Sequence, residues 1–457
     1  MKNTISFKLS GLYKYIPIFF LVLTLPAFAQ VEQSTPSGEQ YNFTLQQAID
    51  YAVAHQVSIL NARIDETIAD KKIREIVGSG LPQINGSVEV DDYLAKPVSI
   101  VPGSFFGQPG HDIAVSFLKQ YQASPGISAS QLIFSGTFLV GLQAAQTYAD
   151  LSKKFVKQSQ IDVVANVTKA YYGVIINEKN LVALDSTISL LQKTLNDAKA
   201  MYTQGFIEKL DVDRITVTLS NLQSSRQNLR SIVDADYYFL KFQMGMAVNA
   251  SLTLTDKLPN EFPAPVIESA DFNKRIEYDI LQTGRKLDAF SVKVTKAGYL
   301  PSLVAFGSLS TVAYRDQFDF LNTRKSWYPT GVIGLKLSVP IFDGGQKSAI
   351  IQQANMVLMK DQNTINNFGN LVDLQVKQAS ISYESSYKIL QSQKDNLKLA
   401  EDVARVTKIK YEDGVGTNLE VIDAESQLVS AQNNYYNALY SMGIAHVDLQ
   451  RAKGILY

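Results

Sequence analysis

The chain has 457 residues, which is long enough for two or three ordinary domains. Its 43 basic and 43 acidic residues balance, so the composition does not indicate a nucleic-acid-binding protein. Cysteine is absent, which excludes disulfides, thiolate metal sites, cysteine nucleophiles and a lipid anchor attached to an N-terminal cysteine.

The N-terminus has the pattern of a secretory signal. Lysines precede an apolar core at 16–25, and the small-x-small sequence Ala27-Phe28-Ala29 comes directly before Gln30. A membrane anchor is the alternative, but the apolar run of about ten residues is shorter than the ~20 that a spanning helix needs. We therefore expect a cleaved signal peptide at 1–29 and an exported protein.

The first half of the mature chain predicts a helix, two strands and two further helices. The first helix is expected at 44–79, and strands follow at 84–91 and 127–134. The next helix is proline-free over 136–203, and at ~1.5 Å per residue it would be roughly 100 Å long. That length exceeds the diameter of a globular core. After a reversal, a helix is expected at 211–244.

The second half repeats this order after a linker at 245–268. The expected elements are a helix at 269–297, strands at 303–314 and 332–339, and helices at 346–410 and 418–453. Two markers support a duplication. The pair Ile133-Phe134 returns 208 residues later, and the sequence Tyr202-x-x-Gly205 returns 209 residues later as Tyr411-x-x-Gly414. The predicted division is a signal at 1–29, a first repeat at 30–244, a linker at 245–268 and a second repeat at 269–457.

The helix lengths agree within each half. The two shorter helices of the first half have 70 residues together, against 68 in the long one, and in the second half the two totals are both 65. Two short helices stacked end to end would therefore match one long helix beside them, as in the side of a tube. In 211–244, eight residues follow a four-three spacing that is typical of a coiled-coil seam, and six of them are apolar: Ile215, Leu219, Leu222, Arg226, Leu229, Val233, Asp236 and Leu240.

The strands alternate between apolar and polar residues. Ile84, Gly86, Val88 and Val90 alternate with Asn85, Ser87, Glu89 and Asp91. Each predicted strand has about ten residues, the length that a tilted strand needs to cross hydrocarbon. A soluble sheet with one wet face would explain the strands alone. It would not explain two helices of about 100 Å that leave the same edge.

Four strands are too few to close on themselves, because the smallest membrane barrels have ~8. An open sheet edge cannot remain in lipid, since its backbone groups would have no partner. If these strands span a membrane, several copies must share one barrel. A dimer with eight strands and a trimer with twelve are both possible, and only the trimer leaves an obvious aqueous bore.

At this point the layout resembles the TolC family of outer-membrane efflux and export channels over nearly the whole mature chain. The most specific segment is Tyr411-x-x-Gly414 followed by residues 418–428, with the sequence NLEVIDAESQL. It is similar to the family pattern Y-x-x-G…D-V-L-D-A…L. The first repeat carries a fainter copy at Tyr202-x-x-Gly205 and Leu210-Asp211-Val212. The strand exit Pro340-Ile341-Phe342-Asp343-Gly344-Gly345 also fits the family pattern.

The resemblance implies a mainly α protein with a membrane β-barrel portion. Three chains would form a twelve-stranded β-barrel continued by a twelve-helix coiled-coil α-barrel, with loops 95–121 and 315–328 outside the cell. It also implies the function of a passive conduit in a tripartite efflux or type I secretion system. The implied partners are two further copies, a periplasmic adaptor (membrane fusion) protein, an inner-membrane transporter and outer-membrane lipid. Neither a cofactor nor a nucleic acid is implied.

The resemblance also assigns roles at the helical tips. Glu420 and Asp423 would form carboxylate rings in the bore, and Asp211 and Tyr411 would hold the periplasmic mouth closed. The adaptor would dock on the exposed tips, which here read Gly205-Phe206 and Gly414-Val415. Gly416 departs from the family pattern, in which a bulky or basic residue stands there. A purely structural role remains open for Glu420, because Thr417 and Glu420 form a capping-box pattern.

No catalytic pattern is visible, so we expect no enzyme activity. His55, His111 and His446 lie far apart in sequence, which favours surface or packing roles over metal binding. The sequence has no phosphate-binding glycine loop. Two other classes of protein remain as alternatives. A trimeric coiled-coil surface adhesin or stalk would not need alternating strands, and a soluble periplasmic enzyme or binding protein would need a compact core with a polar cluster.

Overall fold

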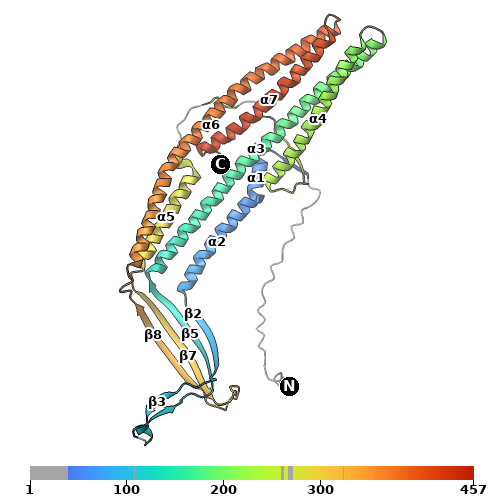
Figure 1. Ribbon diagram of the computed structural model, residues 1–457. Helices are drawn as coiled ribbons and strands as arrows, with labels where there is room; N and C mark the ends of the chain where they lie inside the picture. Colours follow the sequence, from blue (N-terminus) through green and yellow to red (C-terminus); the bar gives the residue numbers. More distant parts are fainter. Residues whose placement is uncertain (1–39, 108, 259–261, 266–270, 323) are drawn as a thin grey trace, which may run out of the picture. The chain divides into compact units, whose positions relative to one another are not determined.

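The computed structural model describes residues 40–107, 109–258, 262–265, 271–322 and 324–457. The predicted signal peptide lies outside these residues. The described chain is mainly helical, with long paired helices and a small antiparallel sheet (Figure 1). This confirms the mainly α fold class that the sequence predicts.

The first half has four helices, α1 (Leu45–His55), α2 (Val57–Gly80), α3 (Gly136–Thr203) and α4 (Lys209–Met244). The bounds of α3 are those that the sequence predicts. The single helix expected at 44–79 is wrong in one respect, because it is divided at Gln56. This residue has an extended backbone, with φ −67° and ψ 127°, and its side-chain oxygen accepts the Ser58 N–H to cap α2. A side-chain cap of this kind leaves no gap in the apolar pattern, so the sequence did not reveal it.

The second half has helices α5 (Ile276–Ala297), α6 (Gln346–Glu412) and α7 (Asn418–Lys453). Here α6 extends two residues beyond its predicted end. The helix expected from residue 269 begins later, and a short 3-10 turn at Phe272–Lys274 precedes it. Residues 269 and 270 lie outside the described part of the chain. Both α4 and α7 have 36 residues and begin 209 positions apart, which is the spacing of the sequence markers.

Four strands form the main sheet in the order β2-β5-β7-β8, and every neighbouring pair is antiparallel. They are β2 (Gln83–Asp92), β5 (Tyr121–Ser135), β7 (Ser302–Arg315) and β8 (Tyr328–Ser338). Each lies where the sequence predicts a strand, but β5 and β7 have 15 and 14 residues rather than about ten.

Four short strands were not predicted, because four residues are too few for a periodic pattern. The expected loop at 95–121 contains a hairpin of β3 (Ser99–Pro102) and β4 (Asp112–Val115), joined through a 3-10 turn at Gly103–Phe106. The expected linker contains β6 (Ser251–Leu254), which pairs in parallel with β1 (Gln40–Phe43).

The register of the main sheet separates an apolar face from a polar face. Paired residues share a face, and neighbours along a strand point to opposite faces. One row across all four strands is Ile84, Ala129, Gly307 and Ile333. The adjacent row, on the opposite face, is Asn85, Ser128, Ser308 and Val332. The apolar face is uncovered within one chain, since Ile84 is 72% exposed and Ile333 is 92% exposed.

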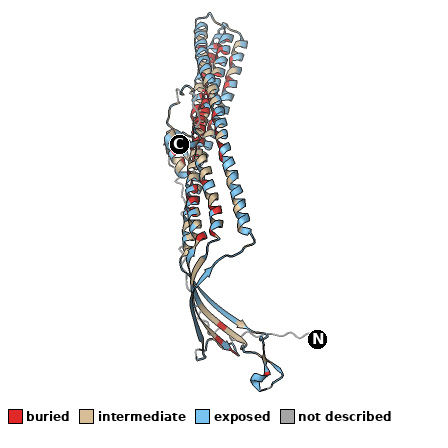
Figure 2. Cartoon of the chain, turned by 90° about the vertical axis from the view of Figure 1, so that its left-hand side faces the viewer, coloured by how far each residue is buried: buried red, intermediate tan, exposed pale blue. Residues whose placement is uncertain are grey.

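The helices form one layer with a fixed lateral order. Near the sheet, α2 packs on α3, α3 on α5, and α5 on α6. Towards the helical tips, α4 takes the place of α2 beside α3, and α7 takes the place of α5 beside α6 (Figure 1). Thus α6 forms one side of the layer along its whole length, and α2 followed by α4 forms the other. Buried residues gather along the lines between neighbouring helices (Figure 2).

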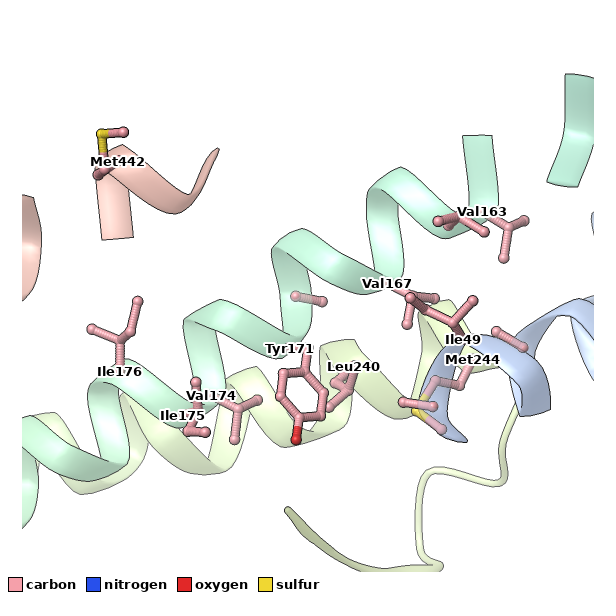
Figure 3. Close-up of a cluster of buried hydrophobic side chains, with 14 of the residues drawn as sticks. Ile49, Val163, Val167, Tyr171, Val174, Ile175, Ile176, Leu240, Met244 and Met442 are labelled. Carbon is pink, nitrogen blue, oxygen red and sulfur yellow. The ribbon is translucent and has the colours of Figure 1, made fainter. Parts of the chain in front are cut away.

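The largest apolar core lies where the short helices meet end to end. Figure 3 shows Tyr171, Val174 and Val167 of α3 beside Leu240 and Met244 of α4, with Ile49 of α1. The Tyr171 hydroxyl donates to the Asp256 carboxylate at 3.0 Å, and the Leu45 N–H donates to the same group at 2.7 Å. This carboxylate therefore joins the start of α1 to α3 through the linker.

The coiled-coil seam predicted in α4 is confirmed. Its buried apolar members are Ile215, Leu219, Leu222, Val233 and Leu240. The two polar members have partners on α3: Arg226 pairs with Asp185, and Asp236 accepts a hydrogen bond from Asn177 at 2.7 Å. Burial raises the pKa of Asp236 above its ordinary value. Partnered polar residues can therefore occupy seam positions without disrupting the helix pair.

Glycines end α4 and α7 in equivalent ways. Gly245 and Gly454 are 209 positions apart and have φ values of +70° and +71°. A Cβ atom would lie 2.7 Å from the carbonyl oxygen of His55 at Gly245, and 2.9 Å from that of Lys274 at Gly454. Each position therefore combines a left-handed backbone conformation with a close backbone contact, and both favour glycine.

We expect Gly245→Ala to destabilise the fold and Gly284→Ala to leave it intact or stabilise it. A non-glycine residue in the left-handed region costs roughly 1–2 kcal/mol, before any displacement of the His55 backbone. Gly284 is helical with open space around its Cβ position, so alanine there gains up to about 1 kcal/mol of helix propensity. Thermal unfolding followed by circular dichroism measures both. Equal shifts in the two variants would contradict this account.

Candidate functional site

Two equivalent reversals form the ends of the helical hairpins. Gly205 and Gly414 have φ values of +79° and +76°, which is the left-handed conformation expected of a glycine that ends a helix. The Phe206 N–H donates to the Met201 carbonyl at 2.9 Å, and the Val415 N–H donates to the Lys410 carbonyl at 3.0 Å. These bonds satisfy carbonyls at the end of each helix that would otherwise have no partner.

Each reversal presents an apolar side chain to solvent. Phe206 is 76% exposed and Val415 is 79% exposed within one chain. The bonds described above fix both residues directly after the glycine. The two tips therefore offer small apolar contacts on a rigid turn.

Gly416 has a structural reason to lack a side chain. A Cβ atom there would lie 3.0 Å from the Tyr411 nitrogen and 3.1 Å from the Lys410 carbonyl carbon. Its N–H also donates to the Lys410 carbonyl at 2.9 Å. A side chain there would require the adjoining backbone to shift by a few tenths of an ångström, which disfavours the bulky or basic residue of the family pattern.

The two hairpins contact each other near their tips. The Asn418 side-chain amide at the start of α7 donates to the Asp211 carbonyl in α4 at 3.0 Å. The Tyr411 hydroxyl of α6 donates to the Met201 thioether of α3 at 3.8 Å. Burial, together with the negative fields of Asp211 and Asp197, raises the pKa of Tyr411 above its ordinary value. This hydroxyl therefore stays protonated and can donate.

The predicted residues Asp211 and Tyr411 thus lie close to each other. Sequence reasoning missed Asn418, which makes one of the hydrogen bonds between the hairpins. Its amide is buried, whereas the first residue of a helix is usually exposed. Asn418 lies in the segment 418–428 that carries the resemblance, but the family pattern specifies no residue at this position.

Glu420 and Asp423 are both exposed and lie three residues apart on α7. Because i and i+3 positions share a helix face, their carboxylates point to the same side. The Thr417 hydroxyl accepts the Glu420 N–H at 3.3 Å, which caps α7. The structure describes this half of the capping box and no reciprocal bond from the Glu420 carboxylate, so that side chain is available for another role.

The histidines have local packing contacts. His55 stacks on Tyr51 with ring centroids 4.1 Å apart, and His446 lies against Phe262 and Tyr383. His111 is exposed. Within the described ranges, no group of three or more His, Cys, Asp or Glu residues could hold a metal ion. Nor is any helix in those ranges both long and apolar enough to cross a membrane.

Comparisons with known proteins agree with this architecture. Residues 286–454 match the family described as "Outer membrane efflux protein". The toluene efflux pump outer membrane protein TtgC of Pseudomonas putida is 22% identical over 344 residues, 74% of this chain and 69% of the relative. The outer membrane protein TolC of Vibrio cholerae is 22% identical over 351 residues, 73% of this chain and 77% of the relative.

Among solved structures, the CmeC outer membrane channel of Campylobacter jejuni has a TM-score of 0.70 at 16% identity. The match covers 90% of this chain and 86% of that one. A likeness at this identity supports the fold, which is that of an outer-membrane channel subunit.

Residues 286–454 match the outer membrane efflux protein family, and the chain as a whole is similar to TolC-family channels. This confirms the resemblance that the tip and strand motifs indicated. The protein is a transport protein and not an enzyme, and its location is the outer membrane of a Gram-negative bacterium.

We expect Asn418→Ala to loosen the contact between the two hairpins. Removing the amide leaves the Asp211 carbonyl without this donor, and a hydrogen bond of this kind contributes about 1 kcal/mol. Backbone amides near both tips should then exchange with solvent roughly 5-fold faster. Asn396→Ala is the control, because Asn396 is exposed on the same hairpin. Unchanged exchange in Asn418→Ala would show that this bond does not hold the tips together.

Proposed function

We propose that three copies of this chain close into one tube, which conducts substrates passively across the outer membrane from a pump in the inner membrane. The observation that carries this proposal is that each side of the chain ends in an open strand edge continued by an apolar helix face. Neither side can remain uncovered in its surroundings, so each must meet a further copy.

One side consists of β2, α2 and α4. No strand pairs with the outer edge of β2 within the described residues, so its backbone N–H and C=O groups face outward. Beyond the sheet, α2 exposes a stripe at helical spacing, and α4 exposes two phenylalanines: Val57, Leu60, Ile64, Ile68, Phe239 and Phe242.

The other side consists of β8 and α6. The outer edge of β8 is likewise unpaired among the described strands. The long helix α6 exposes apolar residues on the side away from α5 and α7: Leu374, Ile381, Leu399, Val403 and Val406. The two sides are therefore complementary: the edge of β2 can pair with the edge of β8 of another copy, and the apolar helix faces can pack on each other. Copies related by rotation would cover both sides at once.

The number of copies follows from the strand count. Two chains would give eight strands, whose interior is filled by side chains, whereas three give twelve and leave an aqueous bore. The family consists of trimeric channels, which supports the larger number. In this arrangement the apolar face of the sheet contacts lipid and the polar face lines the bore. Loops 95–121 and 315–328 then lie outside the cell, and the helices form a twelve-helix α-barrel in the periplasm.

The duplication supports this shape. We propose that residues 30–244 and 269–457 are two structural repeats joined by the linker 245–268. Each repeat supplies two strands and one line of stacked helices, so six similar units surround the bore. The shared spacing of 209 residues at α4 and α7 supports this division.

The tips form the periplasmic mouth in this proposal. The exposed carboxylates of Glu420 and Asp423 would form two rings of three in the trimer, which attract cations and repel anions. Asp211 and Tyr411, together with Asn418, would hold the mouth closed at rest. The exposed apolar tips at Gly205-Phe206 and Gly414-Val415 are the proposed contacts of a periplasmic adaptor.

The transported substrates are those of an efflux pump or of a type I secretion system. TtgC is named as part of a toluene efflux pump, which supports the first. A surface adhesin or stalk is the less favoured alternative, because it gives no role to a sheet with an apolar and a polar face.

Ion selectivity tests the carboxylate rings. In planar bilayers we expect low conductance with a preference for cations, and Asp423→Asn should reduce this preference because it removes three charges from the bore. Glu412→Gln is the control, since it changes an exposed carboxylate at the end of α6. If Asp423→Asn left cation preference untouched, the ring assignment would be wrong.

Conductance tests the closed mouth separately. Tyr411→Phe should raise conductance several-fold, because it removes the hydroxyl that donates to Met201 of the other hairpin. Asp211→Ala should do the same because it removes the carboxylate that we propose acts at the closed mouth, while it keeps the carbonyl that accepts from Asn418. A protein that forms no conducting channel in any variant would refute the conduit itself.

A further inference from the structure

A row of buried oxygen atoms without partners lies along α7. The Asn418 Oδ1, Glu425 Oε2 and Gln432 Oε1 atoms are inaccessible to solvent and accept no hydrogen bond from the described residues. They are spaced seven residues apart, which is two helical turns, so they lie on one face of α7. A buried acceptor without a partner is destabilising, which makes this row the weak part of the packing.

Glu425 is the most deeply buried of the three, at 2% exposure. It is surrounded on its own helix by buried apolar residues, including Val421, Ala424 and Val429. Across the interface, Leu191 and Leu195 of α3 belong to the same apolar cluster as Ile422 and Val429. The carboxyl group therefore lies in an apolar interface between helices.

The charged groups around Glu425 leave it without an ion pair. Lys408 of α6 is the cation whose field acts on it, yet the Lys408 ammonium lies within 3.9 Å of Glu412 instead. On the side towards the tip, the negative charges of Asp197 in α3 and Asp211 in α4 act on Tyr411 of α6. On α7 itself, the nearest carboxylates, Glu420 and Asp423, are exposed.

A buried carboxyl group in these surroundings favours its neutral form. An ionised carboxylate loses its hydration on burial and recovers little from one distant cation. Burial raises the pKa of Glu425 above its ordinary value of 4.5, and the field of Lys408 opposes this only in part. A neutral carboxylic acid can instead remain between α6, α7 and α3 at a much smaller cost.

We infer that Glu425 is a positioning residue for the periplasmic mouth: as a neutral acid it allows α7 to pack in the closed arrangement, and its ionisation loosens that packing so that the channel opens more readily. This inference rests on the proposed conduit function. It differs from the roles of Glu420 and Asp423, which are exposed and would act directly on passing ions.

The direction of the pH effect follows from proton binding. The closed packing binds the Glu425 proton more tightly than an open arrangement does. Closure is therefore fully stabilised below about pH 4.5, the ordinary value, and is lost progressively as the pH rises through the higher value of the closed state. The open fraction should rise up to tenfold for each pH unit between these two values.

Single-channel recording from about pH 4 to about pH 8 tests this inference. We expect the open fraction of the unaltered protein to rise with pH, and that of Glu425→Gln to stay at the low-pH level throughout, because the amide is neutral at every pH. Lys408→Met should extend the rise to higher pH and enlarge it, since it removes the cation that favours ionisation in the closed state. Asp395→Asn is the control, because Asp395 is an exposed carboxylate of α6 that lies far along the helix from Lys408. A rise with pH that persists in Glu425→Gln would overturn the inference.

A second measurement is independent of conductance. Infrared spectra recorded as the pH rises from about 4 should show a protonated carboxyl band that persists above the ordinary value of 4.5 and is missing in Glu425→Gln. Amide exchange in α7 should quicken with pH in the unaltered protein alone. If the protein conducts no ions, the proposed function fails, and these spectra still decide the state of Glu425. Identical spectra in both proteins would show that Glu425 is ionised and would overturn the inference.

Discussion

Among the described strands, the outer edges of β2 and β8 are unpaired, and this is the constraint on which the remaining structure depends. Backbone groups on an open edge have no partner in a medium without water, and four strands cannot curve far enough to pair their own edges. The helices also leave surface uncovered on these two sides, because α2 and α6 expose apolar residues there. In the proposed assembly, both sides of a single chain are therefore completed by other copies.

This constraint explains the unusual proportions of the chain. The wall of a shared tube must have no gap between neighbouring helices. The long helices α3 and α6 run the full length of the helical layer, and the shorter helices are stacked end to end beside them. The stacking points are held by Gly245 and Gly454, which allow backbone contacts that any side chain would prevent. The apolar core is largest at this level, where the ends of α1 and α4 meet on α3. Closer to the tips, packing gives way to polar contacts such as that of Asn418.

Much of the fold could be predicted from sequence because the periodic patterns are long. The bounds of α3 and α7, the four main strands and the α4 seam were all visible in residue spacing. The break at Gln56 and the four-residue strands could not be seen, since a side-chain cap or a short pairing leaves no periodic pattern. At the tips, glycine chemistry located the reversals, and family resemblance supplied Asp211, Tyr411, Glu420 and Asp423. The burial of Asn418 and Glu425 depends on packing between distant helices, which one sequence does not encode locally.

The number of copies in the assembled protein tests the central claim most directly. Native mass spectrometry of the protein extracted in detergent should give a mass equal to three mature chains. The absence of cysteine in the natural chain allows a second check, since one cysteine introduced in β2 and one in β8 should cross-link different copies. A stable monomer, folded with both strand edges uncovered and without such cross-links, would contradict the account.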